Sequence, residues 1–295
     1  MTKYEQELIP TSKARIEMSW PEPLSAKEWD ERFPGVLDSI GFLGGPANVI
    51  MQLARLPVGY GVMESRVESG SVLKHPIKRA RTTATYLAVA MIGTTEERLA
   101  YRQAVNKAHA QVHSTEKSPV RYNAFDTDLQ MWVAACLYWG FADTSTRING
   151  KWTAEQAKEF YRLAAPLGTT LQVRADMWPA DLESFEVHWK KGLDELKLDE
   201  PVRKFLTDLI EFKHIPTLSR LIGPLNRFVT AGFLPQKLRD EMHYEWTEKD
   251  QKKFDRFVRL IGRINGVLPR PVRQAGTLLV MAGFRYRLRK GKTLV

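Results

Sequence analysis

The chain has 295 residues, with 44 Lys and Arg against 34 Asp and Glu, and one cysteine, Cys136. A chain of this length can bury a large core without a disulfide or a structural metal, and a single cysteine excludes an internal disulfide, so we expect a reducing compartment. The N-terminus is charged throughout and no apolar stretch reaches the roughly 20 residues that span a bilayer, which predicts a cytoplasmic protein without a secretory signal or membrane span.

Apolar residues spaced by three and four dominate the sequence, and strand-like alternation is nearly absent. This pattern predicts an all-α fold, and the lack of a linker rich in Gly, Ser or Pro favours one large domain. We expect an N-terminal arm and first helix over residues 1–40, the helical domain over residues 41–288, and a basic tail over residues 289–295.

The first helix of the domain is expected over residues 46–55. Pro46 lies at an early helical position, where its missing N–H costs nothing. Pro57 and Gly59 are expected to end this helix.

Residues 76–92 form the next predicted helix, which is apolar enough to be buried in its second half and stops at Gly93. Thr94 or Thr95 then caps a helix with acidic residues in its first turn. This helix is expected to run to about His113.

An apolar helix is predicted over residues 126–140, where Asp126 can cap the run that starts at Leu129. Because apolar residues surround nearly the whole of it, it should lie at the centre of the domain. Further helices are expected over residues 153–163, 179–196, 200–212, 218–228, 235–241, 248–265 and 270–289.

No Gly-rich phosphate loop, HExxH pair, CxxC pair or GxSxG elbow is present, so candidate chemistry falls on the histidines. Only His109 and His113 are four residues apart on one predicted helix, where they would share a face. Small and apolar residues flank His109. A helix face of this kind leaves room for a planar cofactor and could present the histidine as a proximal haem ligand. From spacing alone, a core histidine bonded to a carbonyl is the favoured alternative.

A polar stripe precedes this helix, formed by Lys78, Arg81, Thr82 and Thr85 at helical spacings. The stripe could hold carboxylates or polarise bound dioxygen. A solvated first turn is the simpler explanation by pattern alone.

Several blocks resemble, in order and spacing, one family that contains the latex clearing proteins and the endoplasmic-reticulum oxygenase of mycophenolic acid biosynthesis. They cover roughly residues 41–287 and comprise Gly44-Gly45-Pro46, His75-Pro76 through Arg79, Arg81-Thr82, Gly93-Thr94-Thr95-Glu96-Glu97-Arg98, His109-Ala110, Tyr122-Asn123-Ala124-Phe125-Asp126, Leu234-Pro235, and Leu268-Pro269 with Arg273.

The resemblance implies an all-helical fold, a b-type haem held through its iron by one histidine, and oxidative cleavage of a carbon–carbon double bond. It assigns His109 as the metal ligand, with His113 where the family has an arginine. Lys78, Arg81 and Thr82 match the distal polar residues, although Lys and Arg are interchanged, so the distal chemistry need not be preserved.

Arg79, His113 and Asp126 complete the expected cofactor-binding set. For Asp126, a plain N-cap is an equally good interpretation. Many bacterial relatives also carry a histidine after the Trp-Val pair, where this chain has Ala134.

We therefore expect a haem-dependent oxidoreductase that uses dioxygen or peroxide on an apolar small molecule, with a cofactor pocket among the helices over residues 76–92, 95–113 and 126–140. Phe125, Trp132, Tyr138 and Trp139 could line an apolar channel, although core packing explains them more simply.

A haem carrier or sensor without turnover is one alternative function. A basic helical protein that binds nucleic acid is another, since the formal net charge is +10. Nucleic acid is disfavoured because the basic residues are spread along the chain, and a solvated helix end accounts for the only dense run, which contains Arg285, Arg287, Arg289, Lys290 and Lys292.

Overall fold

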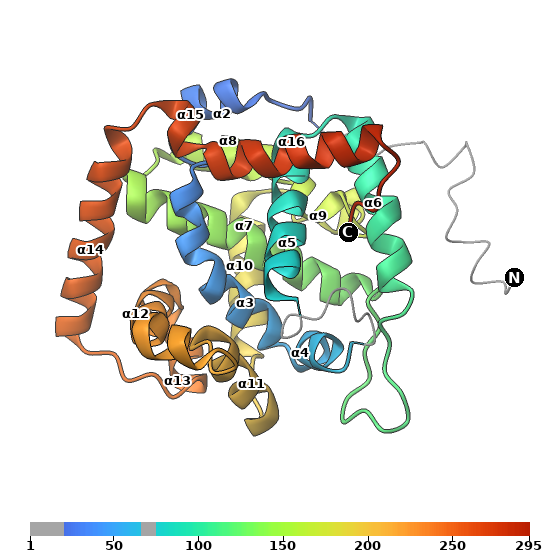
Figure 1. Cartoon of the computed structure of the whole chain (residues 1–295), viewed down its shortest axis with the longest axis vertical. Helices are drawn as coiled ribbons and strands as arrows, with labels where there is room; N and C mark the ends of the chain where they lie inside the picture. The colour runs from blue at the N-terminus through green and yellow to red at the C-terminus, as the bar shows by residue number, and fades with distance from the viewer. Residues whose placement is uncertain (1–20, 66–74) are drawn as a thin grey trace, which may run out of the picture.

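The computed structural model describes residues 21–65 and 75–295. Within them the elements are helices, and the one β pairing is an isolated bridge between His113 and Asn123. The predicted all-α class is confirmed (Figure 1). Half of the segment predicted as the N-terminal arm and first helix, residues 1–20, lies outside the described residues.

The elements follow one another in chain order. They are α2 (Ala26–Arg32), η2 (Ser39–Gly44), α3 (Gly45–Leu53), α4 (Leu56–Met63), α5 (Pro76–Ile92), α6 (Thr95–His109), α7 (Thr127–Asn149), α8 (Ala154–Leu163), α9 (Pro166–Thr169), η4 (Ala175–Met177), α10 (Leu182–Asp194), α11 (Glu200–Ile210), α12 (Pro216–Phe233), α13 (Gln236–Glu241), α14 (Glu248–Gly266), α15 (Arg270–Arg273) and α16 (Ala275–Arg289).

Helix α7 crosses the middle of the molecule, and α3, α9, α14 and η2 pack against it (Figure 1). Asp126 caps it as predicted, since its carboxylate accepts from the backbone N–H groups of Asp128 at 2.9 Å and Leu129 at 3.0 Å. The helix is longer than predicted and ends at Gly150, whose φ of 103° suits glycine. Its buried residues confirm the central position.

Helix α5 has the predicted bounds and is buried from Thr85 onward, as its apolar second half predicted. It packs most extensively on α16, and also on α6 and α9. Its end is tied to the core because the Trp29 indole donates to Met91 O at 3.1 Å.

The first helix ends before Pro57 as predicted, since α3 stops at Leu53, but Pro57 and Gly59 belong to a second helix that was not predicted. They lie inside α4, which begins at Leu56 with Pro57 in its first turn. A proline that cannot continue one helix can start the next, because the first N–H groups of a helix have no partner. A Cβ on Gly59 would lie 2.6 Å from Leu53 O, so this glycine lets α4 turn closely against α3.

The prediction of one continuous helix over residues 270–289 is also wrong, because the structure has two helices there. It is broken at Gln274 into α15 and α16. The Arg273 guanidinium donates from Nη1 to Asp38 Oδ2 at 2.6 Å and from Nη2 to Asp30 Oδ2 at 2.9 Å, and Asn265 Nδ2 donates to the same Asp38 oxygen at 2.6 Å. This buried network joins the C-terminal helices to the segment before η2.

No helix in the described part of the chain is both long enough and apolar enough to cross a membrane.

Candidate functional site

His109 is the last residue of α6. That helix starts at a capping box, in which the Thr94 hydroxyl accepts from Glu97 N and the Glu97 carboxylate accepts from Thr94 N. The imidazole is half-buried, and the Phe125 ring lies edge-on with its centroid 6.3 Å away. The Nδ1 atom is buried and has no hydrogen-bond partner among the described residues. Among the described residues, His109 is therefore not the carbonyl-bonded core histidine that spacing alone favoured.

Burial and, to a smaller extent, the nearby positive charge of Arg79 lower the pKa of His109 to about 4. The imidazole is therefore neutral at neutral pH. A neutral imidazole keeps a nitrogen lone pair, which is the form that binds a metal. Within the described residues, no three or more His, Cys, Asp or Glu side chains gather into a group that could hold a metal ion.

His113 does not share a helix face with His109, contrary to the prediction. The chain leaves α6 at Ala110 and pairs with a later segment, since Ser114 N donates to Tyr122 O and Ala124 N donates to Val112 O, both at 2.9 Å. These bonds replace the continuing helical ones. The His113 ring is exposed, and its Nδ1 lies 3.2 Å from Ser114 O.

Lys78, Arg81 and Thr82 of the polar stripe lie in the first half of α5, whereas Thr85 is buried and its hydroxyl donates to Arg81 O at 2.8 Å. Thr82 is half-buried and its hydroxyl donates to Lys78 O at 3.0 Å, so the side chain is satisfied by its own helix. The Thr82 carbonyl accepts from the Tyr101 hydroxyl at 2.7 Å, which joins α5 to α6. Arg81 is exposed at this end of the helix.

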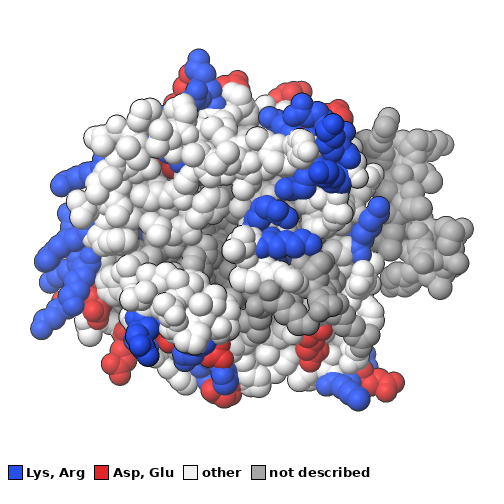
Figure 2. All heavy atoms as spheres, in the orientation of Figure 1, with Lys and Arg blue, Asp and Glu red and all other residues white. Residues whose placement is uncertain are grey.

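Positive charge gathers around the buried ring of Tyr101. Burial raises the pKa of Tyr101, and the charges of Arg79, Arg287 and Arg81 act in the opposite direction. Figure 2 shows Lys and Arg clustered over the C-terminal end of α16 and the adjoining part of α5. We call Arg79, Arg81 and Arg287 the arginine cluster; in the described part of the chain none of them forms an ion pair with a carboxylate.

Arg287 is a member of this cluster that the sequence analysis missed, because it treated the terminal basic run as a solvated helix end. Burial and the charge of Arg81 lower the pKa of Arg287, and its Nε is buried without a partner among the described residues. Arg285, by contrast, pairs with Glu97 at 2.7 Å. The sequence carried a signal for this difference. Arg285 and Arg287 are two residues apart, and side chains two apart on a helix point in nearly opposite directions.

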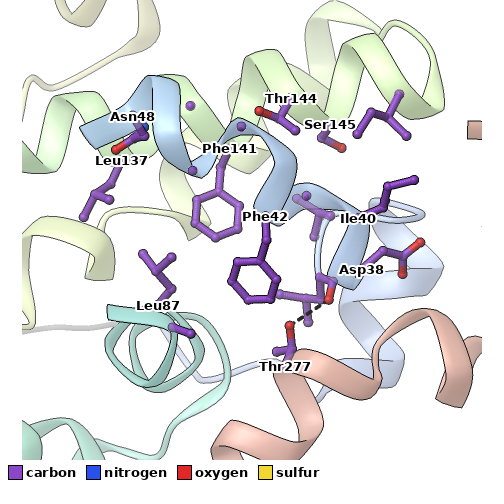
Figure 3. Close-up of a pocket in the computed structure, with 18 of the residues that line it drawn as sticks. Asp38, Ile40, Phe42, Asn48, Leu87, Leu137, Phe141, Thr144, Ser145 and Thr277 are labelled. Atoms are coloured by element: carbon purple, nitrogen blue, oxygen red, sulfur yellow. Dashed lines mark hydrogen bonds between the residues drawn. The ribbon is translucent and has the colours of Figure 1, made fainter. Parts of the chain in front are cut away.

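A partly open apolar cavity of about 110 Å³ lies on another side of α5, lined also by residues of η2, α3 and α7 and by Thr277 of α16. Figure 3 shows the rings of Phe42 and Phe141 meeting Leu87 and Leu137 across it. The α5 residues that line it are Thr83, Ala84, Leu87 and Ala88.

This cavity differs from the predicted cofactor pocket, because α5 and α7 line it but α6 does not. The residues expected at the site are absent from its lining. They are Lys78, Arg79, Arg81, Thr82, His109, His113 and Asp126.

The aromatic residues considered for a channel do not line the cavity either. Trp132 stacks on Trp189 with ring centroids 5.2 Å apart and donates to Met51 O at 3.1 Å. Tyr138 is buried against Phe185, with centroids 4.6 Å apart. Core packing is confirmed for both.

Residues 35–263, more than half of the chain, match the family model described as "ER-bound oxygenase mpaB/B'/Rubber oxygenase, catalytic domain". Two relatives, from Mycobacterium bovis and Mycobacterium tuberculosis, are each 46% identical over 250 residues, which cover 84% of this chain and 98% of theirs. Both are described only as uncharacterized proteins. No solved structure matches the chain. The chain belongs to the mpaB and rubber oxygenase catalytic-domain family, which supports an oxygenase-type activity on a small molecule.

Proposed function

We propose that this member of the family is a haem b-dependent oxygenase or oxidoreductase that acts on an apolar small molecule, with His109 as the proximal iron ligand. The observation that carries the proposal is the buried Nδ1 of His109, which has no partner among the described residues. Its low pKa keeps the ring neutral and able to ligate. One histidine is enough for haem, because the macrocycle supplies the remaining nitrogen ligands.

The arginine cluster supports the same proposal through charge. A b-type haem carries two propionates, and arginine presents a planar fork that matches a carboxylate. Arg79 acts on His109 electrostatically, and Arg81 and Arg287 act on the neighbouring Tyr101. We assign Arg79 and Arg287 to the propionates and keep Arg81 for the oxidant.

Bound haem would supply an iron centre at which dioxygen or peroxide reacts. Thr82 and Arg81 would bind the oxidant by hydrogen bonding, and Lys78 would support that side or a propionate. The Thr82 hydroxyl already donates to Lys78 O, so it would need to rotate or else accept a hydrogen bond. We give Asp126 no catalytic role, because its carboxylate is engaged as the α7 cap.

The apolar cavity favours an enzyme over a haem carrier or sensor, since a carrier needs no room for a substrate. Its lining of Ile40, Phe42, Leu87, Leu137 and Phe141 offers dispersion contacts to hydrocarbon groups. The substrate class proposed is therefore an apolar small molecule.

The test is the absorption spectrum of protein purified with a haem supply, compared with His109→Ala and His113→Ala. We expect a Soret band in the wild type, its loss in His109→Ala with an unchanged circular dichroism spectrum, and its retention in His113→Ala. His113 is the matched control because its ring is exposed in a loop. A wild type that binds no haem refutes the proposal, and full haem in His109→Ala refutes the ligand assignment.

A further inference from the structure

The formal net charge of the chain resides entirely in its C-terminal end. Residues 256–295 contain ten Lys and Arg and no Asp or Glu, while the other 34 Lys and Arg balance the 34 Asp and Glu. This stretch begins in the middle of α14 and includes α15 and α16. The positive charge is therefore far more localised than the even spread of basic residues along the sequence suggested.

The second half of α14 exposes an unusual face. Leu260, Ile264 and Val267 are 57%, 55% and 82% exposed. Arg256, Arg259 and Arg263 are exposed beside them. These six positions, the last of which is the C-cap residue of α14, follow one another at intervals of three, one, three, one and three residues, which places them along one side of the helix. We call them the α14 outer face.

The opposite side of α14 packs into the protein through Phe254, Val258 and Asn265. The outer face therefore belongs to a fixed helix and does not serve the core. Neighbouring α12, which packs on α14, exposes Leu221 and Leu225. Figure 2 shows a broad uncharged area where Figure 1 places α12, α14 and α16, with Lys and Arg along its edge at α14.

We propose that the α14 outer face docks the protein on an anionic lipid surface. A helix that lies in the plane of a bilayer presents large apolar groups to the acyl region and Lys or Arg to the lipid phosphates, which is the composition of this face. The absence of any acidic residue after Asp255 in the sequence leaves no like-charged group to repel the lipid on this segment. Nucleic acid would match the arginines but leave the exposed Leu, Ile and Val without a partner. The docking is independent of haem.

The experiment is co-sedimentation of the full-length protein with vesicles of phosphatidylcholine alone or with equal parts of phosphatidylglycerol. We expect binding to the anionic vesicles that weakens with salt, because the arginines contribute through screened charge. Leu260→Glu with Ile264→Glu should weaken binding by about tenfold or more, since two apolar groups no longer enter the membrane. Arg256→Gln with Arg263→Gln should weaken it and flatten the salt dependence.

Val187→Glu is the matched control, because this residue of α10 is 71% exposed and lies outside the face. It should leave binding unchanged, and circular dichroism should show that all variants are folded. Protein that remains in the supernatant with both vesicle types overturns the proposal, as does equal loss in Val187→Glu. So does a dimer in light scattering that Leu260→Glu dissociates, which would assign the face to a second copy. Salt-sensitive binding to duplex DNA without vesicle binding would assign it to nucleic acid.

Discussion

Replacing Arg273 by Leu should destabilise the protein strongly, although Arg273 lies outside the residues expected at the haem site. Its guanidinium bridges Asp38 at 2.6 Å and Asp30 at 2.9 Å, and the Asp38 side chain has no exposed surface. Without Arg273, the Asp38 carboxylate keeps only the Asn265 donor, because its Oδ1 has no partner among the described residues. A buried charge would be left largely uncompensated.

Breaking a buried pair in this way costs about 3–5 kcal/mol. At about 2.1 cal/mol/K per residue, the unfolding entropy of a chain of 295 residues is about 0.6 kcal/mol/K, so the melting temperature should fall by roughly 5–8 °C. Adding Asp38→Asn to Arg273→Leu removes the buried charge and should restore part of the loss.

Differential scanning calorimetry or thermal circular dichroism measures the shift, and Arg285→Leu provides the control. Arg285 pairs with Glu97 at 2.7 Å, but its side chain is 45% exposed, and such pairs contribute about 0–1 kcal/mol. If Arg273→Leu melts within 1–2 °C of the wild type, or no lower than Arg285→Leu, the network does not hold the C-terminal helices as argued.

Three further predictions concern the site and the cavity. Arg287→Leu should weaken haem binding by roughly tenfold or more in a Soret titration but leave the affinity for haem dimethyl ester unchanged, because the ester lacks the carboxylates that this side chain would bind. Ala84→Leu should fill part of the cavity and abolish the rise in melting temperature that a small apolar ligand such as benzene causes in the wild type, while haem content stays constant. In haem-free protein, the pKa of His109 is about 4 in the folded state and near its ordinary 6.5 in the unfolded state, so the unfolded state binds more protons between these two values. The unfolding free energy measured by urea titration should therefore fall as the pH drops from 6.5 to 4. The fall should be smaller in His109→Gln, which lacks the titrating imidazole.

Local signals predicted the fold well where caps and burial determine the helices. The bounds of α5 and the Asp126 cap of α7 follow from residues within one or two turns. Helix α4 was missed because Pro57 breaks one helix and starts another by the same property, its missing N–H. Only tertiary packing on α3 and α11 decides whether a new helix forms after the break.

The site was harder to predict because long-range contacts determine it. The end of α6 depends on pairing between Val112 and Ala124, so helical spacing wrongly placed His113 beside His109. Arg287 joins Arg81 only through the packing of α16 on α5. The cavity likewise depends on contacts across the chain, such as the bond from Thr277 Oγ1 to Leu37 O at 2.8 Å. No local pattern encodes such contacts.

Helix α5 lies between the two features that matter most for the proposed activity. The carbonyl of Thr82 accepts from Tyr101 beside the arginine cluster, whereas Thr83, Ala84 and Leu87 face the cavity. The helix cannot move far toward either side, because its buried second half is anchored to the core. A cofactor at His109 and an apolar molecule in the cavity would therefore contact one rigid helix from different sides without competing for the same side chains. The single-residue spacing between Thr82 and Thr83 means that a change to the backbone of α5 would alter both sites, while a side-chain change can alter either one alone.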